Sequence, residues 1–122
     1  DNVIRGGLTP KYVDIVELLK IVDCREVTPQ IISAAPQNQS EFTYKTPVND
    51  FALAQIRVEP EQHTKVNLQS AGILLVMRGE LKIQEKSATL TLKQGESAFI
   101  TADSNVEIMS EKGGYALLAK LP

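Results

Sequence analysis

The sequence predicts an all-β domain of the jelly-roll or small-barrel type, preceded by one short helix and an extended connector. Two observations lead to this fold class. From Phe51 onward, short apolar runs, several with a period of two, are separated by turn residues. A helical period of apolar residues occurs near the start of the chain. With 122 residues, 43% of them hydrophobic, the chain is large enough for one compact core.

The helix is predicted over residues 14–22, where four apolar residues follow the spacing of one helix face. These residues are Ile15, Leu18, Leu19 and Val22. Asp14 is followed three positions later by Glu17, as in a capping box, which fixes the start of the helix. The next segment, residues 24–46, contains prolines and the polar run Gln37–Ser40 without a sustained period, so we expect a connector there.

About eight strands are predicted after the connector, the number typical of a jelly roll. The run Gly72–Met77 is apolar on both faces, so we expect it to be a central, buried strand. Gly79 and Gly95 mark turns. The expected strands are Ala52–Val58, Thr64–Ser70, Gly72–Met77, Glu80–Gln84, Ala88–Lys93, Glu96–Ile100, a strand around Val106 and Ile108, and Tyr115–Ala119.

The composition argues against several classes of partner. Thirteen basic and fifteen acidic residues give a net charge of −2, so no strong positive field attracts nucleic acid or an anionic membrane. The longest apolar run is far shorter than the roughly 20 residues of a membrane span. The single cysteine, Cys24, cannot form an internal disulfide and suits a reducing compartment. We therefore expect a cytoplasmic protein with no nucleic-acid or membrane partner.

The first eleven residues read Asp-Asn-Val-Ile-Arg-Gly-Gly-Leu-Thr-Pro-Lys. This run resembles a signature of type I mannose-6-phosphate isomerases, zinc enzymes that interconvert mannose 6-phosphate and fructose 6-phosphate; the family usually has Ala where this chain has Gly6. The similarity continues through residues 12–19, 47–52 and 92–100 in the same order. The resemblance implies that residues 1–23 are the end of the catalytic cupin domain, with the active-site loop and the helix. Residues 24–46 would be the connector, and residues 47–122 a C-terminal, metal-free cupin domain with a jelly-roll barrel.

The same resemblance implies three site residues. Arg5 and Asp1 match catalytic residues of the family, and Lys11 matches a substrate-binding lysine. A guanidinium suits a sugar oxyanion or a phosphate, and a carboxylate can orient a sugar hydroxyl or relay a proton. Judged by spacing alone, Asp1 and Arg5 would more simply form a surface ion pair of little energetic value. The match over eleven residues favours the active site.

No metal site is expected within this chain. The resemblance implies that the zinc ligands of the full-length enzyme lie upstream of Asp1. With Gly79 and Gly95 as the two motif turns, the positions that usually hold cupin metal ligands fall near Lys65, Asn67, Gly72 and Val106. These side chains are poor zinc ligands. The one histidine, His63, is expected in a solvated turn.

The favoured hypothesis is the C-terminal part of a mannose-6-phosphate isomerase, inactive by itself. Its barrel would be structural and would pack on the catalytic domain. The alternative is a non-catalytic cupin module that binds a sugar or a small acid in the mouth of the barrel. The polar residues that would line such a mouth are Gln55, Arg57, Asn67 and Gln69.

Overall fold

The computed structural model describes residues 4–122, and residues 1–3 lie outside the described part. The chain divides into two compact units, Asp1–Gln30 and Ile31–Pro122. Within the described residues, no helix combines the length and the apolar character that a membrane span requires.

The first unit contains the predicted helix, α1 (Ile15–Ile21), in residues that begin and end close to the expected positions. Its N-cap is Asp14, whose Oδ1 accepts a hydrogen bond from the backbone N–H of Glu17 at 2.9 Å. In a complete capping box the Glu17 side chain would accept a hydrogen bond from the N–H of Asp14. Here that N–H donates to the carbonyl of Arg5 at 3.2 Å. The Glu17 carboxylate pairs with Lys20 at 3.0 Å. The cap therefore joins the preceding loop to the helix.

The helix buries none of its residues within this unit. Ile15, Val16 and Leu19 are 55%, 69% and 68% exposed. A seven-residue helix is too short to be stable through its own hydrogen bonds and relies on packing of its apolar face. The apolar side chains of α1 therefore remain exposed within this unit.

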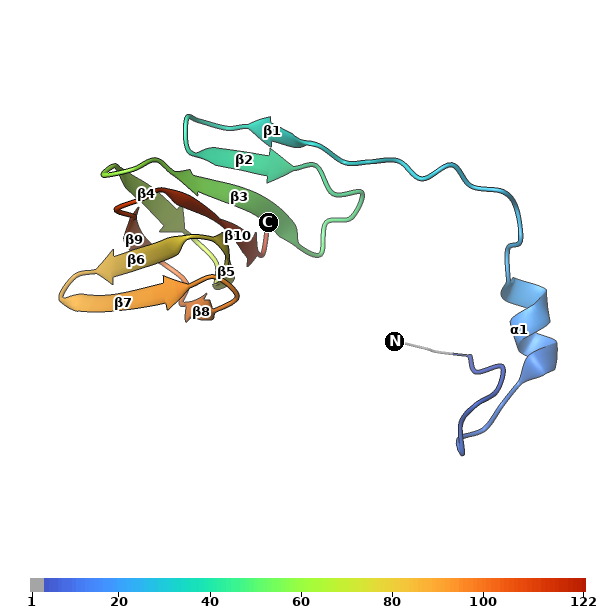
Figure 1. The fold of residues 1–122 in the computed structure, drawn as a ribbon. Coiled ribbons are helices and arrows are strands. Elements are labelled where there is room, and N and C mark those ends of the chain that lie inside the picture. The colour runs from blue at the N-terminus through green and yellow to red at the C-terminus, as the bar shows by residue number, and fades with distance from the viewer. Residues whose placement is uncertain (1–3) are drawn as a thin grey trace. The chain divides into compact units, whose positions relative to one another are not determined.

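The second unit consists of two antiparallel sheets that pack face to face (Figure 1). Sheet A contains, in spatial order, β1 (Ala34–Pro36), β2 (Glu41–Tyr44), β3 (Ala52–Val58), β10 (Gly114–Lys120), β5 (Gly72–Arg78) and β8 (Ser97–Ile100). Sheet B contains β4 (His63–Leu68), β9 (Ser104–Met109), β6 (Glu80–Glu85) and β7 (Ala88–Lys93). Each expected strand is present, so the prediction of an all-β domain is confirmed.

The connector is shorter than predicted, because strands β1 and β2 form within residues 24–46. The polar run between them makes a tight turn in which Asn38 Oδ1 accepts from the N–H groups of Ser40 and Glu41, at 2.9 and 2.8 Å. Strand β2 then pairs along β3. The polar composition therefore indicated a hairpin turn here. Between α1 and β1, the connector without helix or strand covers residues 22–33.

The core lies between the two sheets and consists of alternate residues of each strand. The largest fully buried side chains are Ile56, Leu74, Leu81, Ile108 and Leu118. The prediction that β5 is buried on both faces was half wrong. Leu74 is fully buried, but its neighbours Ile73 and Leu75 are 53% and 36% exposed, because successive side chains of a strand point to opposite faces.

The outward side of sheet A is unusually apolar. Leu53, Ala119, Ile73 and Phe99 follow one another across β3, β10, β5 and β8. In the next row Leu117 pairs with Leu75. We call Leu53, Ile73, Leu75, Phe99 and Leu117 the outer apolar face. In this unit no element of the described residues covers them, and Phe99 is 68% exposed.

The two faces of β5 should differ in their contribution to stability. Leu74→Ala is expected to lower the free energy of unfolding by about 2–5 kcal/mol, because it leaves a cavity in the core. Ile73→Ala, the matched control on the exposed face, should cost no more than about 1 kcal/mol. Urea denaturation of the purified chain measures both values, and equal losses would contradict the assignment of the faces.

Candidate functional site

The loop before α1 contains two of the three residues that the sequence predicted as site residues. Arg5 is half-buried and Lys11 is exposed, while Asp1 lies outside the described residues. The carbonyl of Arg5 accepts the hydrogen bond from the Asp14 N–H at 3.2 Å, so the backbone at Arg5 is tied to the start of the helix. The structure thus places both cations in one loop whose base is held by the N-cap residue.

Local hydrogen bonds give this loop a defined path. The N–H of Lys11 donates to Thr9 Oγ1 at 3.2 Å, and the Tyr12 hydroxyl donates to Asp14 Oδ2 at 3.4 Å. Leu8 has a φ of 55°, in the left-handed region that costs a residue with a Cβ about 1–2 kcal/mol. Its side chain is fully exposed in this unit. Such strain is often found at binding loops, where surrounding structure maintains it.

The loop packs closely on the helix at Gly6. A Cβ added there would lie 2.7 Å from Cδ2 of Leu18 on α1. The obstacle is the end of a flexible side chain, so a small rotation of Leu18 can make room. The alanine that the resembled family usually has at this position is therefore compatible with the same loop.

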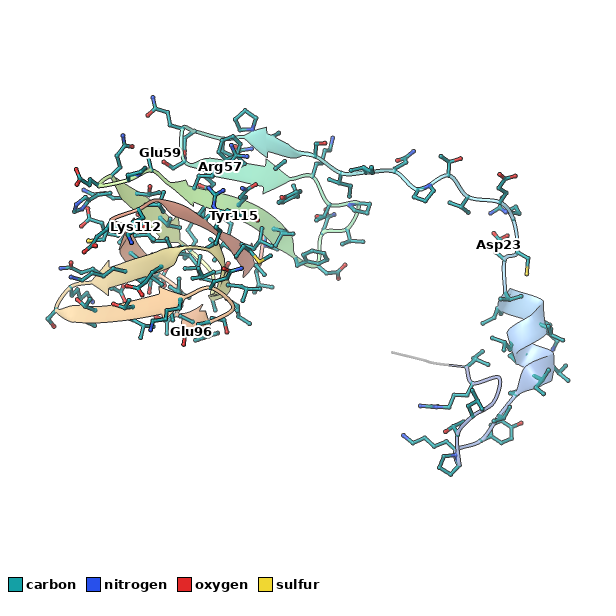
Figure 2. The ribbon with its side chains drawn as sticks, viewed as in Figure 1. Asp23, Arg57, Glu59, Glu96, Lys112 and Tyr115 are labelled. Carbon is teal, nitrogen blue, oxygen red and sulfur yellow. The ribbon has the colours of Figure 1, made fainter. Side chains whose placement is uncertain are left out.

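One solvent-exposed ion pair, Asp23 with Arg25, follows the helix. The Arg25 guanidinium donates to the Asp23 carboxylate at 2.6–2.9 Å, and this side-chain bond lowers the pKa of Asp23 and raises the pKa of Arg25. Asp23 lies in the segment that follows α1 (Figure 2). Both groups are open to solvent, so the pair has little energetic weight.

The described residues do not fit a zinc site. They contain no group of three or more His, Cys, Asp or Glu side chains that could hold a metal ion. Lys65 and Asn67, the expected ligand positions on β4, are exposed on the outward side of sheet B. Val66, which lies between them in sequence, points inward and pairs with the buried Val106 on the adjacent strand β9. The interior at this place is therefore apolar. The positions that we expected to correspond to cupin ligands on β4 therefore lie on the wrong face of the strand.

His63 is the first residue of β4, and the prediction that it lies in a turn was wrong. Its side chain is 55% exposed, and Nδ1 lies 3.4 Å from Glu107 Oε1 on the neighbouring strand β9. A single exposed imidazole beside one carboxylate is a surface pair and provides two potential ligands, fewer than a zinc site needs.

The residues predicted to line a barrel mouth do not come together. Gln55 and Arg57 belong to the outward side of β3 in sheet A, whereas Asn67 points outward from β4 in sheet B. Gln69 is exposed in the turn after β4. Since these side chains lie on opposite outer surfaces, the structure gives no support to a sugar site in the mouth of the barrel.

A cluster of cations at one end of sheet A was missed by the sequence reasoning. Arg57, Arg78 and Lys112, together with Glu59 and Tyr115, line a cavity of about 480 Å³, which we call the basic pocket. Figure 2 labels four of these residues, Arg57, Glu59, Lys112 and Tyr115. Strand pairing brings Arg57 and Arg78 to either side of Tyr115. The signal was present in the sequence only as three well-separated basic residues, and the register of the sheet was needed to unite them.

A family model described as the cupin domain of mannose-6-phosphate isomerase matches residues 40–113, more than half of the chain. The chain belongs to the mannose-6-phosphate isomerase family. Mannose-6-phosphate isomerases of Salmonella typhimurium and Escherichia coli are each 39% identical to it over 95% of this chain. The Bos taurus enzyme is 30% identical over 88% of this chain. The chain spans about 30% of the length of these curated relatives.

Solved structures of the family share the fold. The Salmonella typhimurium mannose 6-phosphate isomerase bound to fructose 6-phosphate and zinc matches 98% of this chain with a TM-score of 0.76 and 38% identity. A point mutant of the same organism's phosphomannose isomerase gives a TM-score of 0.77 and 36% identity. The match covers 30% and 31% of those longer chains, respectively. The predicted cupin-type fold is confirmed.

Proposed function

We propose that the chain is the C-terminal part of a longer isomerase that interconverts mannose 6-phosphate and fructose 6-phosphate. The observation that carries this proposal is the 38% identity, over 98% of this chain, to a Salmonella enzyme whose structure contains fructose 6-phosphate and zinc. In the proposal, zinc is held by residues outside this chain, because the described residues provide no ligand set.

We further propose a division of labour along the chain. Residues 1–23 complete the catalytic domain, and residues 47–122 form the C-terminal cupin domain, to which the β1–β2 hairpin adds an edge. The uncovered apolar side chains of α1 support this division, since the first unit is too small to bury them itself. The remainder of residues 24–46 connects the two.

In this proposal the loop before α1 contributes charge to the reaction. Aldose–ketose isomerisation moves a proton between adjacent carbons and builds negative charge on a sugar oxygen. Arg5, with its permanent charge and fixed donors, would stabilise that oxygen or hold the phosphate, and Lys11 would bind the phosphate. Asp1 would orient a hydroxyl or relay the proton. The N-cap bond to the Arg5 carbonyl supports this role because it fixes the backbone from which the guanidinium extends.

The barrel would serve as a scaffold that packs on the catalytic part through the outer apolar face. Its five side chains form a contiguous apolar surface on sheet A. Contiguous exposed apolar patches commonly mark protein interfaces. A partner with an apolar surface of its own, such as the missing catalytic part, would remove these side chains from water.

The isolated chain should be inactive. We expect the purified 122-residue chain to bind no stoichiometric zinc and to convert no mannose 6-phosphate, because residues 4–122 provide no zinc ligand set. Metal analysis after dialysis and a coupled isomerase assay measure both. Activity that copurifies with the chain would overturn the proposal.

Within the longer enzyme, Arg5→Ala is expected to lower kcat/KM by about 10²–10³-fold, as loss of a donor to a developing oxyanion does. Arg5→Lys should recover little of the lost kcat/KM, since an ammonium group cannot replace the planar guanidinium and its fixed donors. Lys11→Ala should raise KM about tenfold.

The matched control for these variants is Arg25→Ala, which removes an exposed arginine from the connector and should leave steady-state kinetics unchanged. If Arg5→Ala behaves like Arg25→Ala, the loop has no catalytic role, although the family assignment stands.

If the outer apolar face packs on the catalytic part, a charged substitution there should lower stability more in the longer enzyme than in the isolated chain. Phe99→Asp should change the unfolding free energy of the isolated chain by no more than about 1 kcal/mol, because Phe99 is mostly exposed there. In the longer enzyme it should clearly lower the thermal midpoint. Thr91→Asp, which changes an exposed residue on the outward side of sheet B, is the control and should have a small effect in both. Equal midpoints for both variants in the longer enzyme would refute this interface.

A further inference from the structure

We propose that the basic pocket at the end of sheet A binds a small phosphate monoester. The pocket belongs to the second unit, whereas Arg5 and Lys11 belong to the first, and its occupation does not depend on the proposed isomerase function. Its walls come from β3, β5 and β10 and from the turns at Glu59–Pro60 and Lys112–Gly113. Figure 2 shows Arg57, Glu59, Lys112 and Tyr115 at this same end of the sheet.

The charge of the pocket suits a dianion. Three cations, Arg57, Arg78 and Lys112, stand against one carboxylate, Glu59, which leaves an excess of two positive charges. The salt bridges found among residues 4–122 include none of these four side chains. A phosphate monoester carries a charge of about −1.5 to −2 at neutral pH. An anion of this kind would balance the excess charge.

The two arginines are positioned before any ligand arrives. The Arg57 guanidinium lies 4.1 Å from the centroid of the Phe42 ring, and the Arg78 guanidinium lies 5.7 Å from the Tyr115 ring. Stacking on an aromatic ring restricts a long side chain and leaves the edge of the guanidinium available for donors. Two guanidinium groups held in this way can bind a tetrahedral anion through several charge-assisted hydrogen bonds.

A register shift brings Arg78 to this surface. Tyr115 pairs with Arg78, but the next residue, Ala116, pairs with Val76, so β5 contains one extra residue opposite β10. Without the shift, Arg78 would pair with Gly114 and share the inward side of Val76, the side of the core. The bulge therefore gives β5 an outward cation beside Tyr115.

The backbone beside the pocket requires glycine, because neighbouring backbone atoms leave no room for a Cβ. A Cβ at Gly114 would collide with the Arg78 carbonyl oxygen, and a Cβ at Gly79 would lie 2.7 Å from the Gly113 carbonyl oxygen. Gly113 itself has a φ of +76°. The pocket volume of about 480 Å³ falls within the usual range for small-molecule sites and accommodates a hexose phosphate. Tyr115 and Pro60 provide apolar surface for the carbon skeleton.

The test is an NMR titration of the 122-residue chain with inorganic phosphate, with glucose 6-phosphate and with neutral glucose. We expect saturable shifts for both phosphates at the amides of Arg57 and Gly113–Tyr115, with Kd of about 1 mM or lower for glucose 6-phosphate. Inorganic phosphate should bind more weakly, and glucose should cause no saturable shift. Absence of saturable shifts at these amides, or an equal response to glucose, would overturn the proposal.

Charge variants distinguish a specific binding site from nonspecific attraction of the anion by the net charge of the protein. Arg57→Gln and Arg78→Gln should each raise the Kd for glucose 6-phosphate at least about fivefold, whereas Glu59→Gln should lower it. Lys65→Gln makes the same change in net charge on the outward side of sheet B and should leave the Kd unchanged. Retention of the wild-type amide spectrum outside the pocket verifies folding of each variant. If Lys65→Gln weakens binding as much as Arg78→Gln, the anion responds only to net charge and the proposal fails.

Discussion

The pairing of β10 with β3 on one side and β5 on the other determines most of the second unit. The ladder with β3 covers the whole of β10, the ladder with β5 covers residues 115–120, and together they form the centre of sheet A. Because side chains alternate between the faces of a strand, this one register sends Ala116 and Leu118 into the core. The same register aligns the outer apolar face on the opposite side. A slip by one residue would exchange the two sets, so the core, the outer apolar face and the basic pocket depend on a common constraint.

Much of this fold could be predicted from the sequence because the signals were local. Period-two runs and glycine turns marked the strands of residues 52–120, and Asp14 marked the start of α1. The hairpin at β1 and β2 was missed because each strand is short and lies between polar turn residues and prolines. The apolar run of β5 was interpreted as buried on both faces. Its outward residues, Ile73 and Leu75, are exposed within this chain.

The candidate sites were less accessible to sequence reasoning, for physical reasons. Arg5 and Lys11 were predicted as site residues from a contiguous motif, and the structure adds the N-cap bond between Asp14 and the Arg5 carbonyl. The basic pocket consists of residues that are distant in sequence, and no local pattern joins Arg57 to Arg78. Their proximity follows from strand register, which cannot be deduced with certainty from alternation alone. The misplacement of Lys65 and Asn67 has the same origin, because an error of one position changes the face of a strand.

The extra residue in β5 has a consequence for how this family can diversify. A substitution at Arg78 would alter the charge of the surface gradually, but loss of one residue between Val76 and Gly79 would remove the bulge altogether. The ladder would then become regular, and only one of Met77 and Arg78 would remain between Val76 and the Gly79 turn. Insertions and deletions, which are usually tolerated in loops, would here act within a strand. A deletion that removed Arg78 would take this cation away together with the bulge, whereas a deletion of Met77 would leave it opposite Tyr115.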